Sequence, residues 1–530
     1  MFRVKNFSKY SYLEPPHLLA DIRDSFERFL KEDIKTAFKE FFPIFDYSGK
    51  ELRLDFVDLE IGEARITEEE AKYYGVNYDA PLRVTLKLTN LLTKEEKIQK
   101  IYFGDIPLLT PRGSFIINGH ERIIVNQLLR SPGIYFNFVL YGEKKKWGAK
   151  IIPQQGAWLE FQVEATNLLQ VRIEKRKKFL FSILLKAFGF ETNEEIFEIL
   201  KEYENPENPI LSLTFKKDKT ENREEALLEI HRKMKPIEPN TYDNAFYYFE
   251  STFLNTQRYN LSRVGRFHIN RRLKRNSESL TLEKEDLIEV VKEILRLEND
   301  PLAEKDDIDA LYNRRIRDLG ELLENQVKIA LSRLKRDIQD KMSSVSKLEE
   351  FTPYQIIHPR KFSNTILEFF NISRLSQVLD QTSPLSEIEN KRVITASGPG
   401  GVSKERASLE VRDVHPSHYG RICPIQTPHE GQGIGVKLNK ALYSRRNALG
   451  FLETPYLRVK NGKVTDEILW LTYDQEFNEV IASTSEIITL PDSKAAFLSK
   501  PVITKGISGF TKGIDCLCIL VPICNLLASS

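Results

Sequence analysis

Short runs of lysine and arginine are the residues of this chain best suited to binding a polyanion. Four such runs lie at 144–146, 175–178, 271–275 and 314–317. The whole chain carries 78 Lys and Arg against 76 Asp and Glu, yet closely spaced cations can still neutralise phosphates locally. The alternative is a solvated helix face on which these cations pair with neighbouring Glu and Asp. The residues alone leave both interpretations open.

A second candidate site is the glycine-rich segment 398–401, which is followed by Lys404 and Arg406. Glycine tolerates positive φ and lets a ligand approach the backbone closely, and the two cations add charge beside it. The segment lacks the Gly-Lys-Ser/Thr ending of a Walker phosphate-binding loop. It therefore indicates either a binding loop or an ordinary surface turn.

Histidines and cysteines supply a third candidate, a metal site. The residues that could form it are His415, His418, Cys423 and His429. Their spacing matches no familiar structural zinc pattern, and prolines and polar turns interrupt the segment. Three further cysteines, at 516, 518 and 524, have no histidine near them in sequence. We expect no metal in this chain.

No familiar catalytic motif accompanies these candidates. The sequence has neither the Gly-x-Ser-x-Gly elbow of serine hydrolases nor the His-Glu-x-x-His helix of zinc proteases. Asp306, Asp307 and Asp309 form an acidic cluster, but a charged face beside the basic run at 314–317 explains them as well. The residues alone therefore indicate a nucleic-acid-binding scaffold without an obvious catalytic centre.

The cysteine content and the apolar stretches indicate a compartment. Four cysteines in 530 residues are typical of a reducing environment. The N-terminus lacks the apolar core of a signal peptide. The longest apolar stretch, 514–528, contains Asp515 and Pro522 and is too short to span a bilayer. We expect a cytoplasmic protein without a membrane partner.

The elements that must position these residues alternate between helices and strands. An apolar face through Ile22, Phe26 and Phe29 predicts a first helix. Alternating apolar residues after position 52, from 84 to 88 and around 101–103 predict antiparallel strands. Because a chain of 530 residues exceeds the size of a single core, we expect an α+β protein of at least three modules.

Further elements are expected along the rest of the chain. Residues 178–200 show a helical pattern with Asn193 as a plausible N-cap, whereas the polar, proline-interrupted segment 203–225 is interpreted as a surface insertion or linker. A long helix is expected over 316–341, with a boundary at 342–355. Asn461-Gly462 predicts a hairpin turn.

Several blocks resemble those of one known family. Segments 104–136, 258–273, 306–317, 375–388, 397–428 and 450–456 resemble, in family order, the signature blocks of bacterial RNA polymerase β subunits. The resemblance implies mixed antiparallel sheets and helices arranged as protrusion, lobe and fork modules. The implied boundaries are 1–128 (protrusion, first part), 129–315 (lobe), 316–372 (return into the protrusion), 373–440 (fork and rifamycin-pocket region), 441–510 (β-rich external region) and 511–530 (an anomalous tail).

The resemblance also implies roles in nucleic-acid binding. Segment 398–408 matches the fork loop, where downstream duplex opens, so Lys404 and Arg406 would face nucleic acid. Three residues match positions that contact the non-template strand: Arg130, Asp309 and Arg314. Three residues lie along the path of the nascent RNA in the family: Gln377, Lys404 and Glu430. All would bind and position, and none would transfer protons.

Segment 375–397 resembles the rifamycin pocket of the family but departs from its pattern. The positions implied are Gln377, Val378, Asp380, Asn390, Arg392, Val393, Thr395, Ser397 and Pro428. Asn390 stands where histidine is usual, Val393 where arginine is usual, Thr395 for serine and Ser397 for leucine. Since valine cannot hydrogen-bond to the drug, and an unmatched polar group costs about 1–3 kcal/mol, we expect weak rifamycin binding.

Other departures lie nearby and at the end of the sequence. His429 resembles a one-residue insertion, and Gln426 replaces an expected glutamate, so the turn beside the RNA path is expected to be reshaped. Segment 511–530 is rich in cysteine and apolar residues and matches the family only at 513–515. It suggests a split gene, a frameshift or a premature stop.

The resemblance places the chemistry outside this chain. In the family, two metal ions clamp the attacking 3′ oxygen and the leaving pyrophosphate, and β′ aspartates hold the Mg²⁺. We therefore expect no cofactor and no catalytic residue here, and a chain that is inactive alone. The implied partners are the β′, α and σ subunits, the DNA strands and nascent RNA. The alternative is a free-standing module that binds nucleic acid or an accessory factor.

Overall fold

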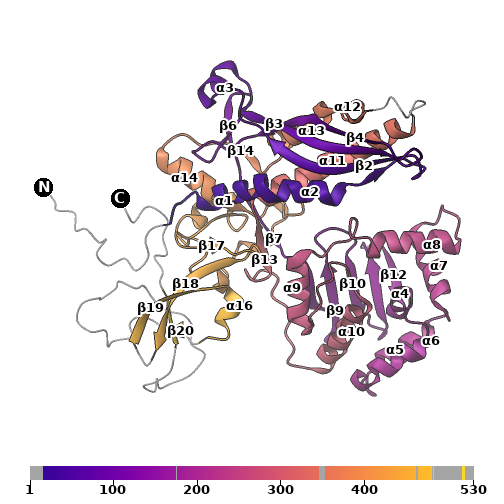
Figure 1. Cartoon of the computed structure of the whole chain (residues 1–530). Helices are drawn as coiled ribbons and strands as arrows, with labels where there is room; N and C mark the ends of the chain where they lie inside the picture. Colours follow the sequence, from indigo (N-terminus) through magenta and orange to yellow (C-terminus); the bar gives the residue numbers. More distant parts are fainter. Residues whose placement is uncertain are drawn as a thin grey trace. The chain divides into compact units, whose positions relative to one another are not determined.

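The computed structural model describes residues 16–174, 176–344, 352–460, 463–479, 481–482 and 516–519. The described residues fall into two compact units (Figure 1). Unit 1 contains the chain up to Leu129 and from Asp309 onward, whereas unit 2 is the continuous segment Arg130–Ile308. Each unit has its own hydrophobic core.

Unit 1 begins with a helical run and continues with strands. Its first elements are α1 (Ala20–Arg28), the π-helical turn η2 (Phe29–Asp33), α2 (Ile34–Phe41), β1 (Ile44–Phe45), β2 (Leu52–Ile61), α3 (Glu68–Tyr74), β3 (Asp79–Asn90), β4 (Glu96–Pro107), β5 (Phe115–Ile117), β6 (His120–Ile124) and β7 (Asn126–Arg130). The expected first helix is confirmed, since Ile22, Phe26 and Phe29 are all buried.

The rest of unit 1 follows unit 2 in the sequence. Its elements are β13 (Arg314–Arg317), α11 (Leu319–Ser343), α12 (Pro353–Ile356), α13 (Pro359–Ile372), β14 (Ser376–Val378), α14 (Pro384–Arg392), β15 (Val393–Thr395), η5 (Lys404–Arg406), α15 (Leu409–Arg412), η6 (Pro416–His418), η7 (Thr427–Gly433), β16 (Lys437–Asn439), β17 (Arg445–Arg446), β18 (Leu452–Lys460), β19 (Lys463–Leu471), α16 (Tyr473–Glu476), β20 (Ile481–Ala482) and β21 (Cys516–Ile519).

The largest core of unit 1 lies between helices and a four-stranded antiparallel sheet of order β1-β2-β3-β4. Alternate residues of β3, such as Val84 and Leu86, are buried, which confirms the strands predicted from alternation. Helices α11 and α13 pack with α1 and α2 into the same core. Figure 1 shows α11 and α13 beside β2–β4.

The long helix α11 was expected over 316–341 and is confirmed, but it begins later. Residues 314–317 form β13, so the helix starts at Leu319, after the N-cap Asp318. The carboxylate of Asp318 accepts a hydrogen bond from the backbone N–H of Glu321 at 3.0 Å, a standard start for a helix. Of the expected boundary at 342–355, residues 345–351 lie outside the described residues.

Three further sheets lie in the described part of unit 1. Their strand orders are β13-β7-β15-β16, β14-β6-β5, and β17-β18-β21-β20 with β19 paired to β18. Lys460 pairs with Lys463 in the antiparallel β18–β19 ladder, which confirms the expected hairpin, although Asn461 and Gly462 lie outside the described residues. Of the tail at 511–530, the structure describes β21, which pairs antiparallel with β18.

Unit 2 combines a five-stranded antiparallel sheet with helices. Its elements are β8 (Gly133–Tyr141), β9 (Lys144–Ile152), β10 (Leu159–Val163), β11 (Leu169–Ile173), β12 (Lys177–Leu180), α4 (Phe181–Phe188), α5 (Asn193–Leu200), η3 (Lys201–Tyr203), α6 (Ile210–Lys217), α7 (Arg223–Met234), α8 (Tyr242–Phe249), η4 (Glu250–Leu254), α9 (Ser262–Leu273) and α10 (Lys284–Asn299). The strands follow one another in the sheet in sequence order, and the helices bury their apolar faces in the same core.

Two expectations for unit 2 were wrong. The N-cap of α5 is Thr192, whose hydroxyl accepts from the backbone N–H of Glu195, and Asn193 is the first helical residue. Segment 203–225 is not a linker, because it contains α6, whose residues Ile210 and Leu211 are buried. The two prolines that suggested a linker precede α6, and most of the charges lie before or after its apolar residues.

The architecture is α+β with several antiparallel sheets, as expected from the sequence. The finer module boundaries inferred from the family resemblance stay predictions. Among the helices that the structure describes, none combines the length and the apolar character needed to cross a bilayer.

Candidate nucleic-acid interface

The glycine-rich segment forms a tight loop, here called the glycine loop (residues 397–402), directly after β15. The N–H of Gly401 donates to the carbonyl of Gly398 at 2.9 Å, and the N–H of Val402 donates to that of Ala396 at 2.9 Å. Gly398 has a φ of 104° and Gly400 a φ of 77°. A side chain at Gly401 would overlap the carbonyl oxygen of Ala396. The loop therefore needs its glycines for conformation.

Gln127 holds the glycine loop from the neighbouring strand β7. Its fully buried carboxamide Nε2 donates to the carbonyl of Ser397 at 2.9 Å and to that of Pro399 at 3.0 Å. Thr395 lies opposite Gln127 in the parallel pairing of β15 with β7. Sequence reasoning missed this positioning residue, because about 270 residues separate it from the loop and nothing local marks it.

The structure describes the side chain of only one of the two cations that follow the glycine loop. The side chain of Arg406 is exposed in η5. The backbones of Lys404 and Glu430 lie in η5 and η7, but their side chains, like that of His429, lie outside the described residues. The described loop thus presents an ordered backbone with an exposed guanidinium five residues after Gly401. This arrangement can bind a phosphate backbone or a strand of bases.

Two groups of predicted rifamycin-pocket positions lie on and beside the strands β14 and β15, which belong to different sheets. Gln377 lies in β14 opposite Ile123 of β6, and Thr395 lies in β15 beside β7. Leu379 and Val393 join Ile123 in one small apolar cluster. The structure therefore brings these two segments together around β6 and β7.

The polar positions of this region mostly bond within the chain. The Asp380 carboxylate accepts from the hydroxyl of Thr382 at 2.6 Å, and this hydrogen bond lowers its pKa. The side-chain oxygen of Asn390 accepts from the backbone N–H of Asp380 at 3.4 Å. The hydroxyls of Thr395 and Ser397 lie 2.7 Å apart. By contrast, Val378 and Pro428 are exposed.

Arg392 is buried and acts inside the fold. Its guanidinium donates to the carbonyl of Ala441 at 3.0 Å, and burial lowers the pKa of Arg392 to about 10. Its neighbour Val393 is 2% exposed. Gln426, where the family has glutamate, donates from its amide to the carboxylate of Glu389. A glutamate at 426 would face a second carboxylate there, which explains the amide physically.

The three positions implied to contact the non-template strand have different settings. Arg314 lies in β13 and is only 7% exposed, so its guanidinium is part of the interior of unit 1. Asp309 is half-buried in the turn before that strand. Arg130 is exposed, and its guanidinium lies 5.7 Å from the centre of the Tyr135 ring within unit 2.

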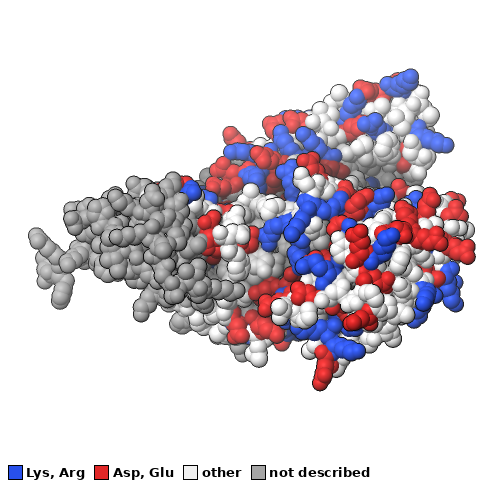
Figure 2. Space-filling model, turned by 90° about the horizontal axis from the view of Figure 1, so that it is seen from below, with Lys and Arg blue, Asp and Glu red and all other residues white. Residues whose placement is uncertain are grey.

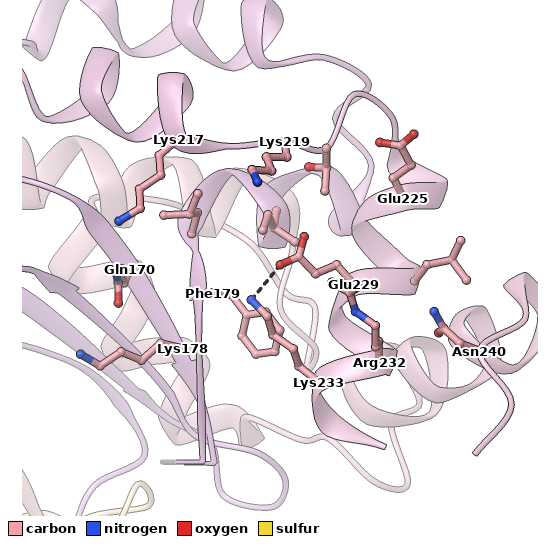
Figure 3. A pocket seen from close by; sticks show the side chains of 14 residues that line it. Gln170, Lys178, Phe179, Lys217, Lys219, Glu225, Glu229, Arg232, Lys233 and Asn240 are labelled. Carbon is pink, nitrogen blue, oxygen red and sulfur yellow. Dashed lines mark ion pairs between the residues drawn. The ribbon is translucent and has the colours of Figure 1, made fainter. Parts of the chain in front are cut away.

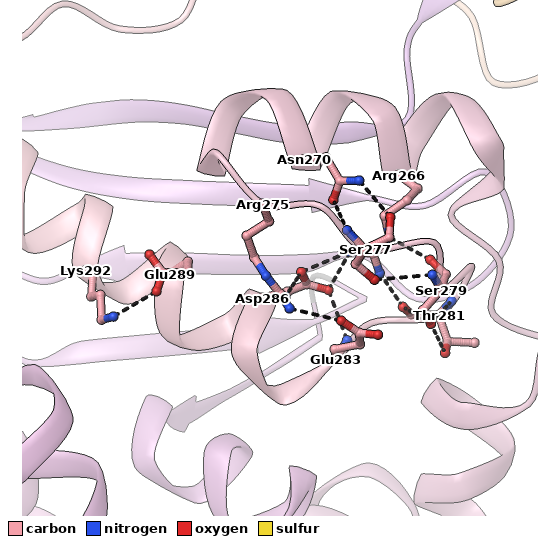
Figure 4. Close-up of polar contacts among 10 residues, drawn as sticks. All are labelled: Arg266, Asn270, Arg275, Ser277, Ser279, Thr281, Glu283, Asp286, Glu289 and Lys292. Atoms are coloured by element: carbon pink, nitrogen blue, oxygen red, sulfur yellow. Dashed lines mark hydrogen bonds and ion pairs between the residues drawn. The ribbon is translucent and has the colours of Figure 1, made fainter.

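The densest basic run, at 271–275, belongs to an internal ion-pair network with the nearby Arg266 (Figure 4). The carboxylate of Asp286 bonds to Arg266 through both oxygens at 2.9 Å and also to Arg275. Arg272 pairs with Glu293 at 2.8 Å, and its guanidinium lies 4.6 Å from the Phe136 ring centre. The alternative interpretation, cations paired with acidic neighbours, therefore describes Arg272 and Arg275 of this run.

Each of the other runs contains at least one cation that pairs with a carboxylate of the same unit. Lys146 pairs with the buried Glu298 at 2.6 Å, Lys178 pairs with Glu164, and Arg315 pairs with Glu321. Figure 2 shows acidic and basic side chains interspersed over the face in view. Asp306, which we expected to face the run at 314–317, instead accepts from the backbone N–H of Phe136 at 2.7 Å and pairs with Arg272.

The histidines at 415 and 418 bond within their own turn. Nδ1 of His415 lies 2.7 Å from the hydroxyl of Ser417, and burial lowers the pKa of His418 to about 3. Cys423 is buried. Across the residues that the structure describes, no group of three His, Cys, Asp or Glu side chains is placed to hold a metal ion.

Comparisons with known proteins place these features in a family. Residues 130–317 match the family model described as RNA polymerase Rpb2, domain 2, and residues 377–445 match RNA polymerase Rpb2, domain 3. The "DNA-directed RNA polymerase subunit beta" of Gloeobacter violaceus is 42% identical over 496 residues, covering 92% of this chain and 43% of that relative. The proteins of the same name from Listeria welshimeri and Listeria monocytogenes are 37% identical, covering 94% of this chain and 49% of each relative. The chain thus spans less than half the length of these relatives.

Proposed function

Since this chain belongs to the RNA polymerase β-subunit family and corresponds to its N-terminal part, we propose that it supplies nucleic-acid-facing surfaces of a DNA-directed RNA polymerase. The observation that carries the proposal is similarity at 37–42% identity over more than nine-tenths of the chain. The role is template-directed RNA synthesis as one part of an assembly. Its partners are the β′, α and σ subunits, the two DNA strands and the nascent RNA.

In this proposal the glycine loop and Arg406 contact nucleic acid where the strands separate. Because two hydrogen bonds from Gln127 fix the backbone of the glycine loop, the loop keeps its shape when a nucleic-acid strand binds. Little conformational entropy is therefore lost on binding. Arg406 supplies an exposed cation for phosphate or for stacking on a base. Lys404, Glu430 and Gln377 line the RNA path by family position, and Arg130, Asp309 and Arg314 belong to the non-template side.

The chemistry of nucleotide addition is assigned to the rest of the assembly. The catalytic Mg²⁺, which would stabilise the attacking and leaving oxygens, is proposed to be held by β′. The residues of this chain bind, position and separate strands. The isolated chain is therefore expected to bind nucleic acid without polymerising.

The weak rifamycin binding expected from sequence remains part of the proposal. Val393 packs with Leu379 in an apolar cluster, so it offers neither a charge nor a hydrogen bond to a drug. Nη1 and Nη2 of Arg392 donate to backbone carbonyls of this chain. Strong inhibition of the assembled polymerase at low rifamycin concentration would contradict this part.

Affinity purification of the tagged chain from its host, at moderate salt, tests the proposed function. We expect β′ and α to co-purify in stoichiometric amounts and the complex to synthesise RNA from a template. If the chain purifies alone and binds single-stranded DNA with an affinity that falls steeply with salt, the free-standing binding module is the better account.

A further inference from the structure

Unit 2 contains a cavity that the proposed function does not use. It has a volume of about 510 Å³, within the range of sites for small molecules. Strands β11 and β12, helices α4, α6 and α7 and the loops near them supply its walls. Five cations and two carboxylates line it: Lys178, Lys217, Lys219, Arg232, Lys233, Glu225 and Glu229.

The cations of this cavity are of two kinds. Lys233 pairs with Glu229 at 2.7 Å and lies 5.0 Å from the centre of the Phe179 ring, and Lys178 pairs with Glu164. Lys217, Lys219 and Arg232 have no acidic partner within the described part of the chain. The cavity lining offers these three cations one further carboxylate, that of Glu225, so positive charge remains in excess.

A buried ion pair fixes the loop that carries two of these cations. Asp218 accepts from Lys186 at 2.8 Å and from the hydroxyl of Ser182 at 2.6 Å. The Lys186–Asp218 side chains are both fully buried. Lys186 also donates to the carbonyl of Thr220 at 2.6 Å. Asp218 and Thr220 therefore point inward.

The alternation along this loop sends its lysines outward. Lys217 and Lys219, on either side of Asp218, are exposed and line the cavity. Figure 3 shows them along one side of it, with Lys178, Arg232 and Lys233 across the hollow. The buried Asp218 anchors the backbone between them, so both lysines start from a fixed position at the edge of the cavity. Such an arrangement is suited to an anion that bridges several cations.

We propose that this cavity binds a small polyphosphate anion, an inorganic polyphosphate chain or the phosphates of a nucleotide. Lysine presents compact point charges with rotatable donors, which suit the oxygens of consecutive phosphates, whereas paired carboxylates are better matched by the planar fork of arginine. The cavity volume of about 510 Å³ suits a ligand of nucleotide size. Phe179, Leu180 and Ile183 form an apolar floor against which a base could pack.

Isothermal titration calorimetry of the full chain tests the proposal, with tripolyphosphate, ATP, AMP and adenosine as separate ligands. We expect tripolyphosphate and ATP to bind with one-to-one stoichiometry and adenosine not to bind. The double variant Lys217→Gln/Lys219→Gln should weaken tripolyphosphate binding by about tenfold or more, because two charge-assisted contacts are lost. Arg232→Gln, a change in α7 outside that loop, should weaken it as well.

The matched control removes two charges elsewhere in unit 2. Lys144 and Lys305 are exposed and lie outside the cavity lining, so Lys144→Gln/Lys305→Gln should change the affinity by less than about twofold. Equal weakening in the control and the test variant would overturn the proposal, as would the absence of tripolyphosphate binding.

The ligand series separates the two phosphate sources. Tighter binding of ATP than of tripolyphosphate supports a nucleotide whose base uses the apolar floor, and equal binding supports the phosphate chain alone. A single-stranded DNA oligomer that loses affinity in Lys217→Gln/Lys219→Gln, when tripolyphosphate does not bind at all, overturns the small-anion proposal in favour of a polymer. The purification test of the proposed function does not depend on any of these results.

Discussion

Two basic regions of unit 2 differ in a way that their sequences conceal. The run at 271–275 is dense in arginine, yet Arg272 and Arg275 bond to carboxylates of the same unit. Lys217 and Lys219 lie apart from Arg232 in the sequence, yet all three line one cavity and form no ion pair within the described part of the chain. The density of basic residues along the sequence therefore does not show whether their side chains are free to bind a ligand. They are free only where no other segment brings carboxylates to them.

The largest expected effect on stability comes from removing Asp286, the carboxylate that pairs with Arg266 and Arg275. Asp286→Ala leaves Arg266 and Arg275 without their shared carboxylate, and Arg266 is almost completely buried. Breaking a buried pair from one side costs about 3–5 kcal/mol, so the free energy of unfolding of unit 2 should fall by that amount. Urea denaturation followed by tryptophan fluorescence in a Trp470→Phe background reports on unit 2, which contains the other two tryptophans.

The control for this variant is Glu289→Ala. Glu289 pairs with Lys292 along the exposed side of α10, an interaction worth about 0.3–0.5 kcal/mol. If Asp286→Ala proved as mild as this control, the run at 271–275 would be less dependent on its internal partners than the geometry indicates. Its arginines would then count again as candidates for a polyanion.

An intermediate loss of stability is expected at acidic pH. Burial alone would raise the pKa of Asp218, but hydrogen bonds from Lys186 and Ser182 outweigh it and hold the pKa below its ordinary value. A carboxylate with a lowered folded pKa stabilises the fold fully above its unfolded pKa of about 3.9, and this stabilisation is lost as the pH falls through the folded pKa. Unit 2 should therefore lose stability below about pH 3.9, in part through Asp218.

The variant Asp218→Asn isolates this contribution. It keeps the shape of the side chain but cannot titrate, so stability at neutral pH should fall and its decline in acid should become shallower than that of wild type. The exposed Glu224→Gln should leave the acid profile unchanged. An unchanged slope in Asp218→Asn would mean that the buried pair does not hold the lysine-bearing loop.

The smallest expected effect is on the free energy of unfolding when Lys217 and Lys219 are replaced. Lys217→Gln/Lys219→Gln removes two like charges that have no acidic partner, so the free energy of unfolding should change by less than about 0.5 kcal/mol or rise slightly. The same denaturation assay measures it. A large loss would show that these lysines stabilise the fold, which would remove the contrast between the two regions.

The sequence predicted what depends on local periodicity. The helix face through Ile22 and Phe26, the strand alternation at Val84 and Leu86, and the hairpin around 461–462 follow from spacings within a few residues, and the structure has all of them. The family resemblance marked segment 398–408 as a loop of interest, and its role in binding stays a prediction. This resemblance depends on long, specific segments in a fixed order, and the chain contains them.

The sequence could not predict partners that lie far apart along the chain. Gln127 reaches the glycine loop only because β7 and β15 lie side by side. Lys217 and Lys219 lie in a segment whose polar composition suggested a linker, so their convergence with Arg232 had no local signal. The run at 271–275 was open to two interpretations because Asp286 belongs to a different helix, α10.

Site-specific photo-crosslinking tests the central claim most directly. A photo-reactive amino acid would replace Arg406 in one variant and Arg275 in another, each assembled with the remaining polymerase subunits on a labelled, partly opened DNA. We predict strong crosslinks to DNA or RNA from position 406 and only background from position 275. Equal labelling from both positions, or labelling from 275 alone, would contradict the account.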